Sequence, residues 1–385
     1  PRVTSPCDLC AGAVVPSRRR PVRGRCPARG DRGNTVEKAI ASLLMRVEPG
    51  ITHVEVEGLQ PIPGGFSRET FRCDVRVTRN GGTETLPLII RKNPPDVEAI
   101  LNTSRAVEHD LIEALRTRTN VPVSRSYGYE LDAAPFGEPA MVLERASGSG
   151  QTSALFNGGA DEHMTEDVIR HLCEVLVELH SVDIGTIDPT GALADPRGVG
   201  IRAGSWDEYM DTTFDYYLRE YKTIAWDPTM MILLDSFLTL RRLKPRPMKL
   251  AVVHGDFNPA NFLYADGKVT ALIDWENSRI GDPREDLGWM VLMDILSNTQ
   301  VMSYPKKEGG FLAYYNKLTG LDITPEELGY FTLFGTANIA VPVHQSVARR
   351  MRKEHLLLLP LYLTQSSMPA LPAMAQLMAY PGATA

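Results

Sequence analysis

The chain has 385 residues, of which 43% are hydrophobic and 23% charged, a composition that excludes an intrinsically disordered protein. The formal net charge of −6 hides an asymmetry, because residues 1–35 hold eight Arg and two Asp, which leaves −12 on the rest of the chain. Such an acidic body argues against nucleic acid as a partner, since nucleic-acid binding needs a basic surface that replaces phosphate counterions.

Residues 1–35 form a basic segment without the apolar stretch of a secretory signal. We expect a disordered or artificial extension there, with an Arg-rich transit peptide as the alternative. The five cysteines are an odd number and favour a reducing compartment, so we expect a cytoplasmic protein. Cys7 and Cys10 form a CxxC motif, but no second CxxC or His pair follows to complete a zinc site.

The first part of the body has the pattern of a sheet. Alternating residues and apolar runs predict five strands, near 53–57, 71–77, 86–90, 124–130 and 139–144. The first two form a hairpin, and Asn80-Gly81 marks the turn after the second. Apolar residues at helical spacing over 100–115 predict one helix after the third strand. This pattern predicts an antiparallel sheet of five strands with one inserted helix.

A Gly/Ser-rich stretch at 146–159 ends that pattern, and the chain then takes a helical period. Predicted helices lie at 164–180, 209–221, 230–243, 287–296, 311–318 and 331–352. Residues 356–385 carry no charge, but interrupting prolines and a polar stretch favour buried helices over a membrane span. The sequence thus predicts an α+β protein with a small lobe, residues 36–146, a larger helical lobe, residues 147–385, and no membrane partner.

The segment most informative about chemistry runs from His254-Gly255-Asp256 to Asp274. A short strand, a polar loop and a hairpin that turns at 265–267 would bring Asp256, Asn261 and Asp274 together. Carboxylate and amide oxygens suit Mg²⁺, which takes its other ligands from phosphates and water. Alone, His-Gly-Asp is a common turn and His254 a typical core histidine. An Asp, an Asn five residues on and an Asp thirteen residues further follow the order of a kinase active site.

This signature resembles that of the aminoglycoside phosphotransferase and choline kinase superfamily, and so does the segment GDPREDLGW at 281–289. Over about residues 45–300 the chain looks most similar to the kinase-like domain associated with acyl-CoA dehydrogenases. The resemblance implies a two-lobed protein-kinase-like fold. It also implies a catalytic base at Asp256, Mg²⁺ ligands at Asn261 and Asp274, and a structural acid at Asp286 that braces the catalytic loop.

The small lobe carries a second part of the resemblance. Residues 62–71 are similar to the family's glycine-serine loop, whose backbone N–H groups would cap the ATP phosphates. Arg91 stands where most kinases have Lys, and a guanidinium can bind phosphate and pair with a Glu on the inserted helix. Lys92 would point to the opposite face of the strand, into solvent. The resemblance implies ATP contacts at Gly65, Ser67, Arg91, Glu108 and Glu144, the last in a hinge segment at 143–145 that binds adenine.

Two assignments stay open. Glu276 either approaches metal or substrate or is a solvated carboxylate. An aromatic stripe either lines the acceptor pocket or, as is commoner at helical spacing, belongs to the core. It comprises Trp206, Tyr209, Tyr216 and Tyr217.

The resemblance implies an ATP-dependent phosphotransferase that moves the γ-phosphate of Mg·ATP to a hydroxyl of a small molecule. We favour a hydroxylated metabolite as acceptor, for example a hydroxyacyl-CoA, since the basic run at 349–353 would meet CoA phosphates; that run is also typical of a solvated helix end. An aminoglycoside is the second choice because the acidic body would attract a polycation. The alternatives are a catalytically idle nucleotide-binding regulator and a metal-dependent hydrolase. The hydrolase would be built on His254, Asp256, Asp274 and Glu276.

Overall fold

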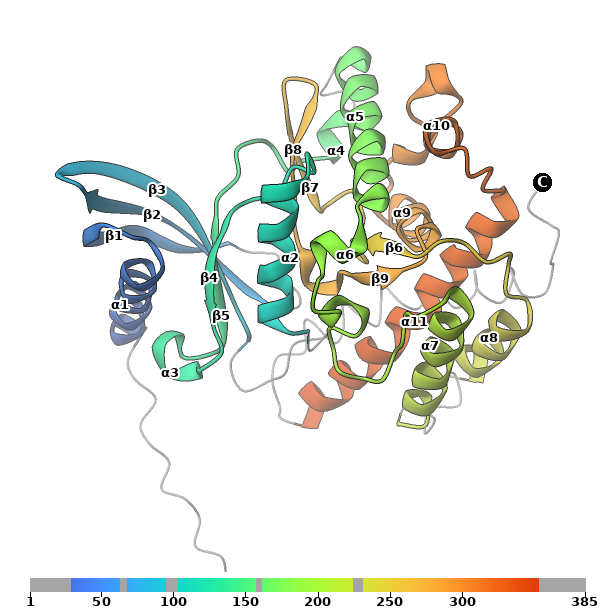
Figure 1. The fold of residues 1–385 in the computed structure, drawn as a ribbon, viewed down its shortest axis with the longest axis horizontal. Coiled ribbons are helices and arrows are strands. Elements are labelled where there is room, and N and C mark those ends of the chain that lie inside the picture. The colour runs from blue at the N-terminus through green and yellow to red at the C-terminus, as the bar shows by residue number, and fades with distance from the viewer. Residues whose placement is uncertain (1–28, 63–67, 95–102, 157–160, 224–230, 353–385) are drawn as a thin grey trace, which may run out of the picture.

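The computed structural model describes residues 29–62, 68–94, 103–156, 161–223 and 231–352. Figure 1 shows a small lobe built on a sheet beside a larger, mainly helical lobe. The expected two-lobed, kinase-like α+β architecture is therefore confirmed.

The small lobe contains the predicted sheet of five strands, all paired antiparallel in the order β1-β2-β3-β5-β4. Its strands are β1 (Ile51–Ile62), β2 (Glu69–Arg79), β3 (Gly82–Lys92), β4 (Ser126–Glu130) and β5 (Ala140–Glu144). Asn80 and Gly81 both have positive φ, 52° and 78°, as a two-residue hairpin turn requires. This tight turn fixes the register of β3 and so places Arg91 near its end.

One long helix follows the third strand, as the sequence analysis expected. It is α2 (Arg105–Arg118), and its N-cap Ser104 accepts a hydrogen bond from Val107 N. The first residues of the expected helix, 100–102, lie outside the described residues.

A helix that the sequence analysis missed packs on this sheet. It is α1 (Arg29–Val47), and it buries Ile40, Leu43 and Leu44 against the sheet residues Val75 and Ile90 in one core cluster. It begins inside the segment that was expected to be a disordered or artificial tail, of which residues 1–28 are not described. A short helix, α3 (Ala133–Phe136), joins β4 to β5.

The large lobe contains the six predicted helices. They are α5 (Glu162–Ser181), α7 (Trp206–Tyr221), α8 (Met231–Arg242), α9 (Arg284–Ser297), α10 (Phe311–Thr319) and α11 (Pro325–Arg352). Two one-turn helices, α4 (Ser153–Phe156) and α6 (Ile184–Ile187), were not expected. Helix α9 packs closely on α11, because a Cβ on Gly288 would lie 2.5 Å from the Phe331 backbone.

The large lobe also contains two small antiparallel pairs. The first joins β6 (Ala251–Val253) to β9 (Arg279–Gly281), and the second joins β7 (Phe262–Ala265) to β8 (Lys268–Leu272). The turn at Asp266-Gly267 is the predicted hairpin turn. Across the described ranges, no helix is long and apolar enough to cross a membrane. Residues 356–385, expected to form buried helices, lie outside these ranges.

Candidate active site

The loop after β6 is held by a carboxylate of α9. Asp286 accepts hydrogen bonds from His254 N and Gly255 N, each at 2.8 Å, and lies 3.0 Å from Nε2 of His180. Burial alone would raise the pKa of Asp286, but these hydrogen bonds hold it below its usual range. The expectation that Asp286 braces this loop is confirmed.

Gly255 is required by the path of the loop. Its φ is +75°, and a Cβ there would collide with the carbonyl oxygen of Asn277 and the guanidinium of Arg279. Asn277 Nδ2 also donates to the Gly255 carbonyl at 2.6 Å. The loop and the turn after β8 are therefore packed backbone against backbone.

His254 is the core histidine that the sequence analysis considered. It is fully buried, its Nε2 lies 3.0 Å from Ile273 O, and its Nδ1 lies 3.3 Å from Asp256 N. This pairing assigns the proton to Nε2. Burial lowers the pKa of the ring, so it stays neutral. Because both ring nitrogens face protein partners, His254 has no free nitrogen for a metal, which argues against the hydrolase hypothesis.

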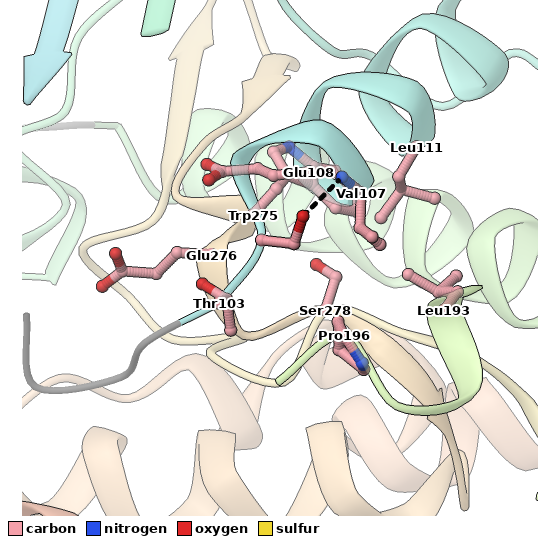
Figure 2. A pocket seen from close by; sticks show the side chains of 10 residues that line it. Thr103, Val107, Glu108, Leu111, Leu193, Pro196, Trp275, Glu276 and Ser278 are labelled. Carbon is pink, nitrogen blue, oxygen red and sulfur yellow. Dashed lines mark hydrogen bonds between the residues drawn. The ribbon is translucent and has the colours of Figure 1, made fainter. Parts of the chain in front are cut away.

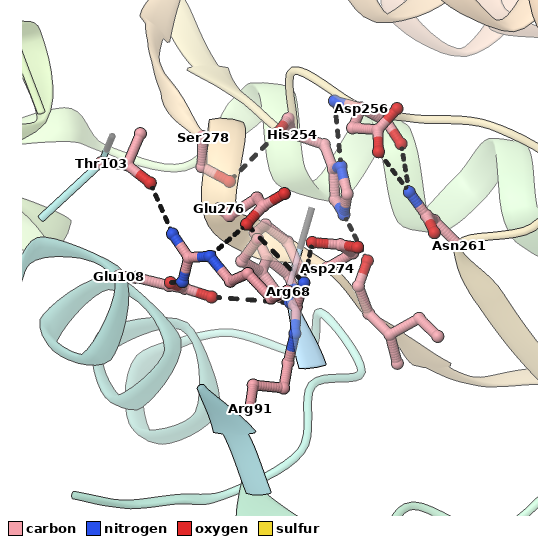
Figure 3. A network of polar contacts seen from close by, with 12 residues as sticks. Arg68, Arg91, Thr103, Glu108, His254, Asp256, Asn261, Asp274, Glu276 and Ser278 are labelled. Atoms are coloured by element: carbon pink, nitrogen blue, oxygen red, sulfur yellow. Dashed lines mark hydrogen bonds and ion pairs between the residues drawn. The ribbon is translucent and has the colours of Figure 1, made fainter. Parts of the chain in front are cut away.

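The Asp256 carboxylate accepts three hydrogen bonds. Asn258 Nδ2 and Trp289 Nε1 donate to Oδ1 at 2.8 and 2.7 Å, and Asn261 Nδ2 donates to Oδ2 at 2.7 Å. Figure 3 shows Asn261 and Asp256 facing each other. Burial and the negative charge of Asp274 raise the pKa of Asp256 to about 7, although the hydrogen bonds oppose this rise.

Asp274 is the second residue after β8, at the end of the hairpin where the sequence analysis expected it. Ile273 N donates to Asn261 O at 2.9 Å, which ties the two candidate metal ligands together. Asp274 has a left-handed backbone (φ 68°, ψ 59°), a strained conformation for a residue other than Gly. The structure therefore brings Asp256, Asn261 and Asp274 together.

Arg91 reaches this cluster from the small lobe. Its Nη2 lies 2.7 Å from Asp274 Oδ1, and this guanidinium lowers the pKa of Asp274 although burial opposes it. The expected pair with Glu108 is present but long, at 3.8 Å. Arg91 is thus held mainly by Asp274 rather than by the helix glutamate.

Arg68 is a second buried guanidinium, and the sequence analysis missed it. It lies 3.1 Å from Glu108, 2.5 Å from Glu276 and 3.1 Å from Thr103 Oγ1. Figure 3 shows Arg68 and Arg91 side by side among the carboxylates. Arg68 immediately precedes β2, and Arg91 lies on β3, the strand paired with β2.

Glu276 is not solvated, and that interpretation was wrong. The residue is 7% exposed and lies between Arg68 and Arg91, the latter at 3.7 Å. Burial and the charge of Asp274 raise the pKa of Glu276 to about 7. Lys92 was also expected in solvent, but its side chain is 14% exposed and lies 3.1 Å from Glu69. In both cases an opposite charge on a neighbouring strand or turn holds the side chain against the protein.

The remaining expected ATP contacts are placed only in part. Gly65 and Ser67 lie outside the described residues. Glu144 ends β5, and the backbone N–H groups of Glu144 and Arg145 donate to Arg125 O and Pro87 O at 2.8 and 2.9 Å. An adenine ring at this hinge would therefore need other groups of the segment.

A small cleft adjoins the charged network. It has about 180 Å³ of open space, part of it continuous with solvent, with carboxylates of Glu108 and Glu276 on one side and Leu111 and Leu193 on the other (Figure 2). The cleft thus borders two of the carboxylates that surround the buried arginines.

The aromatic stripe belongs mainly to the core, so its place in an acceptor pocket is not borne out. Trp206, Tyr209 and Tyr217 are at most 6% exposed. Trp206 Nε1 donates to Asp282 at 2.6 Å and Tyr209 OH to Glu285 at 2.7 Å. Tyr216, half-buried, packs under guanidinium groups. The basic run at 349–353 lies where no side chain is described.

The chain is similar in sequence to known proteins. A model of the phosphotransferase enzyme family matches residues 58–321. The chain is 29% identical over 213 residues to acyl-CoA dehydrogenase family member 10 of Mus musculus, covering 53% of this chain and 18% of the relative. It is 24% identical over 268 residues to acyl-CoA dehydrogenase family member 11 of Homo sapiens, covering 65% and 32%. The chain thus spans about a fifth to a third of the length of these relatives.

Solved structures share the fold. A candidate aminoglycoside phosphotransferase of Ralstonia eutropha has a TM-score of 0.62 at 20% identity, covering 88% of this chain and 97% of that chain. Aminoglycoside phosphotransferase APH(4)-Ia, in complex with ADP and hygromycin B, has a TM-score of 0.53 at 15% identity, covering 91% and 100%. At these identities the likeness establishes the fold alone. The match of the family model over most of the chain goes further: the chain belongs to the phosphotransferase enzyme family.

Proposed function

We propose that this chain is an ATP-dependent phosphotransferase that moves the γ-phosphate of Mg·ATP to a hydroxyl of a small metabolite. The observation that carries the proposal is the meeting of Asp256, Asn261 and Asp274 with Arg91 where the lobes join. Such a set of oxygen ligands, carboxylate and guanidinium is what phosphoryl transfer requires.

Asn261 and Asp274 fit a magnesium site. The Asn261 amide nitrogen donates to Asp256, so its oxygen is the atom left for a cation. Asp274 is ionised, because its pKa is lowered. Mg²⁺ bound there would neutralise charge on the ATP phosphates.

Asp256 is the proposed base. In the proposed transfer the acceptor oxygen forms a bond to the γ-phosphorus while the bond from that phosphorus to the β–γ bridging oxygen breaks. The leaving electron pair goes to ADP and the hydroxyl proton to Asp256. Because the transition state is loose, Asp256 acts mainly by orienting the hydroxyl, which supports a contribution of about 10²- to 10⁴-fold.

Arg91 is the proposed phosphate ligand from the small lobe. A guanidinium can leave Asp274 for phosphate oxygens and keep two hydrogen bonds there. Glu108 and Glu276, both within 3.8 Å, would hold it in the new position. We also propose that Gly65 and Ser67 cap the phosphates and that the hinge near Glu144 holds adenine.

For the acceptor we propose a hydroxyacyl-CoA, because the related chains are named acyl-CoA dehydrogenase family members. An aminoglycoside is the second candidate, supported by the acidic body and by the hygromycin B complex of one structural neighbour. The two acceptors differ in charge, since CoA is a polyanion and an aminoglycoside a polycation. Measuring activity on both classes of compound therefore distinguishes the two candidate acceptors.

The test has two stages. Thermal-shift titrations with Mg²⁺ alone and with Mg·ATP compare the native chain with Asp274→Asn, and a shift that needs nucleotide and Asp274 is expected. Stabilisation by metal alone would instead favour the hydrolase. ADP release is then measured across hydroxyacyl-CoA thioesters, aminoglycosides, choline-like amines and sugars. Nucleotide binding without ADP release on any of them would favour the idle regulator.

A further inference from the structure

We propose that Trp289 is a positioning residue for phosphoryl transfer: with Asn258 it saturates Oδ1 of Asp256 and leaves Oδ2 to accept the proton of the acceptor hydroxyl. The inference rests on the proposed function and deepens it, because it names the reactive oxygen and the side chain that selects it.

Counting hydrogen bonds on the carboxylate leads to this assignment. Each carboxylate oxygen offers about two lone-pair sites. Oδ1 accepts from Asn258 Nδ2 at 2.8 Å and from Trp289 Nε1 at 2.7 Å, which fills both of its sites. Oδ2 accepts from Asn261 Nδ2 at 2.7 Å, and the described part of the chain supplies no second donor to it. One site on Oδ2 therefore remains for a substrate hydroxyl.

The open oxygen lies on the side of the proposed metal site. The amide group that donates to Oδ2 belongs to Asn261, whose own oxygen is a proposed Mg²⁺ ligand. A hydroxyl hydrogen-bonded to Oδ2 would therefore lie next to the bound phosphates, whereas one bonded to Oδ1 would have to displace Asn258 or Trp289. The pattern of donors thus selects an orientation for the acceptor.

The indole is fixed by the same helix that braces the loop. Trp289 and Asp286 are three residues apart on α9 and so lie on one side of it. Asp286 binds the loop backbone at His254 and Gly255 while Trp289 binds the Asp256 side chain. A rigid helix therefore positions both the backbone and the carboxylate of the proposed base.

Helix α11 is shaped to admit the ring. A Cβ on Gly335 would lie 3.2 Å from Cε3 of Trp289, closer than ordinary van der Waals contact. The indole is thus packed against α11 on one side and bonded to Asp256 through its N–H. Trp289 as a whole is half-buried.

The test compares Trp289→Phe with Trp206→Phe, which removes a similar indole N–H bond, to Asp282, in the core. For Trp289→Phe we expect kcat to fall about 10- to 100-fold, the range for losing a hydrogen bond to a charged group, with KM for Mg·ATP changed less than about threefold. The acid limb of the kcat/KM profile should move to higher pH, because a donor that favours the ionised carboxylate is gone. Trp206→Phe should lower the melting temperature and leave the pH profile in place.

A readout without turnover separates this inference from the proposed function. In the free protein, carboxyl NMR should show Asp256 titrating at higher pH in Trp289→Phe than in the native chain. Replacing Trp289 by 3-(3-benzothienyl)alanine, which keeps the ring shape without the N–H, gives the same test should the Phe variant fold poorly. An unchanged Asp256 titration, or equal pH shifts in both Phe variants, would overturn the inference. A native chain that neither binds nor turns over Mg·ATP would overturn the proposed function instead.

Discussion

Arg91 Nη2 lies 2.7 Å from Oδ1 of Asp274, across the boundary between the lobes and 183 residues along the chain. The two side chains are the proposed ligands of adjacent parts of Mg·ATP, Arg91 of the phosphates and Asp274 of the metal. In the free protein they neutralise each other, so the ligand has to separate them. The cost of separation is limited because Glu108 and Glu276 lie within 3.8 Å of the same guanidinium.

Removing the guanidinium should weaken nucleotide binding before it affects chemistry. We expect Arg91→Ala to raise KM for Mg·ATP about 10- to 100-fold, the loss typical of a charge-assisted hydrogen-bonded contact. Arg91→Lys should restore most of the affinity for Mg·ATP, since a Lys occupies this position in most kinases. Arg76→Ala, which removes an exposed guanidinium paired with Glu55 on the same sheet, is the control and should leave KM unchanged. Steady-state kinetics with a luminescent ADP assay checks all three, and an unchanged KM in Arg91→Ala would contradict the assignment.

Activity should have an acid limb set by Asp256. Its pKa is raised to about 7 by burial and by Asp274, so below pH 7 the free enzyme carries a protonated, inactive base. The logarithm of kcat/KM for Mg·ATP should rise with unit slope up to about pH 7 and then level off. In the free protein, Asp274→Asn removes the raising charge and should lower the Asp256 titration, which carboxyl NMR measures. If the pKa of Asp256 is unchanged in Asp274→Asn, burial alone raises it.

Much of this site was predictable because its determinants are local. Alternation and hairpin turns fix strand ends, and the spacing from Asp256 through Asn261 to Asp274 places three side chains at one end of a hairpin whatever the rest of the fold does. The missed helix α1 carried a signal too, since Val36, Ile40 and Leu43 recur at helical spacing. The sequence analysis ended the basic tail at residue 35 and assigned no element between it and the first strand.

The charge pairing could not be predicted in the same way. Glu108 was assigned to Arg91, yet Arg68 lies closer to it, and this choice depends on how two adjacent strands present their side chains to one helix. The burial of Glu276 likewise requires the small lobe to cover the turn after β8. Trp289 had a clear place in the segment 281–289, but nothing in the sequence indicates that its N–H reaches Asp256.

The brace at Asp286 should matter for stability as well as activity. Asp286→Asn replaces an acceptor of three hydrogen bonds by a group that also donates, and breaking such a buried set costs about 3–5 kcal/mol. Because the pKa of Asp286 is lowered, its stabilisation is present above the unfolded pKa and is lost as pH falls through the folded one. The difference in melting temperature between variant and native chain should therefore shrink in acid.

Asp215→Asn is the matched control for this variant. Asp215 is a largely exposed partner of Arg241, so its loss should change stability by less than about 1 kcal/mol. Chemical denaturation at pH 7.5 and pH 4 compares the two. If both substitutions lower the free energy of unfolding by the same small amount at pH 7.5, Asp286 does not brace the loop after β6.

Alanine substitutions at Gly255 and Gly81 separate the cost of backbone strain from the cost of a steric clash. Gly81→Ala and Gly255→Ala both place a Cβ at positive φ, +78° and +75°, but only at Gly255 does that Cβ meet other atoms. Gly81→Ala should therefore cost only the left-handed strain, about 1–2 kcal/mol, and leave activity intact. Gly255→Ala should in addition push the loop away from Asn277, displace Asp256 and lower kcat by at least about 10²-fold, as a shift of about 1 Å does in a positioned site. Denaturant midpoints measure the cost of backbone strain in each variant, and kcat measures the effect of the displaced loop. If Gly255→Ala lowers kcat no more than Gly81→Ala does, the loop tolerates the displacement and its position does not set the rate.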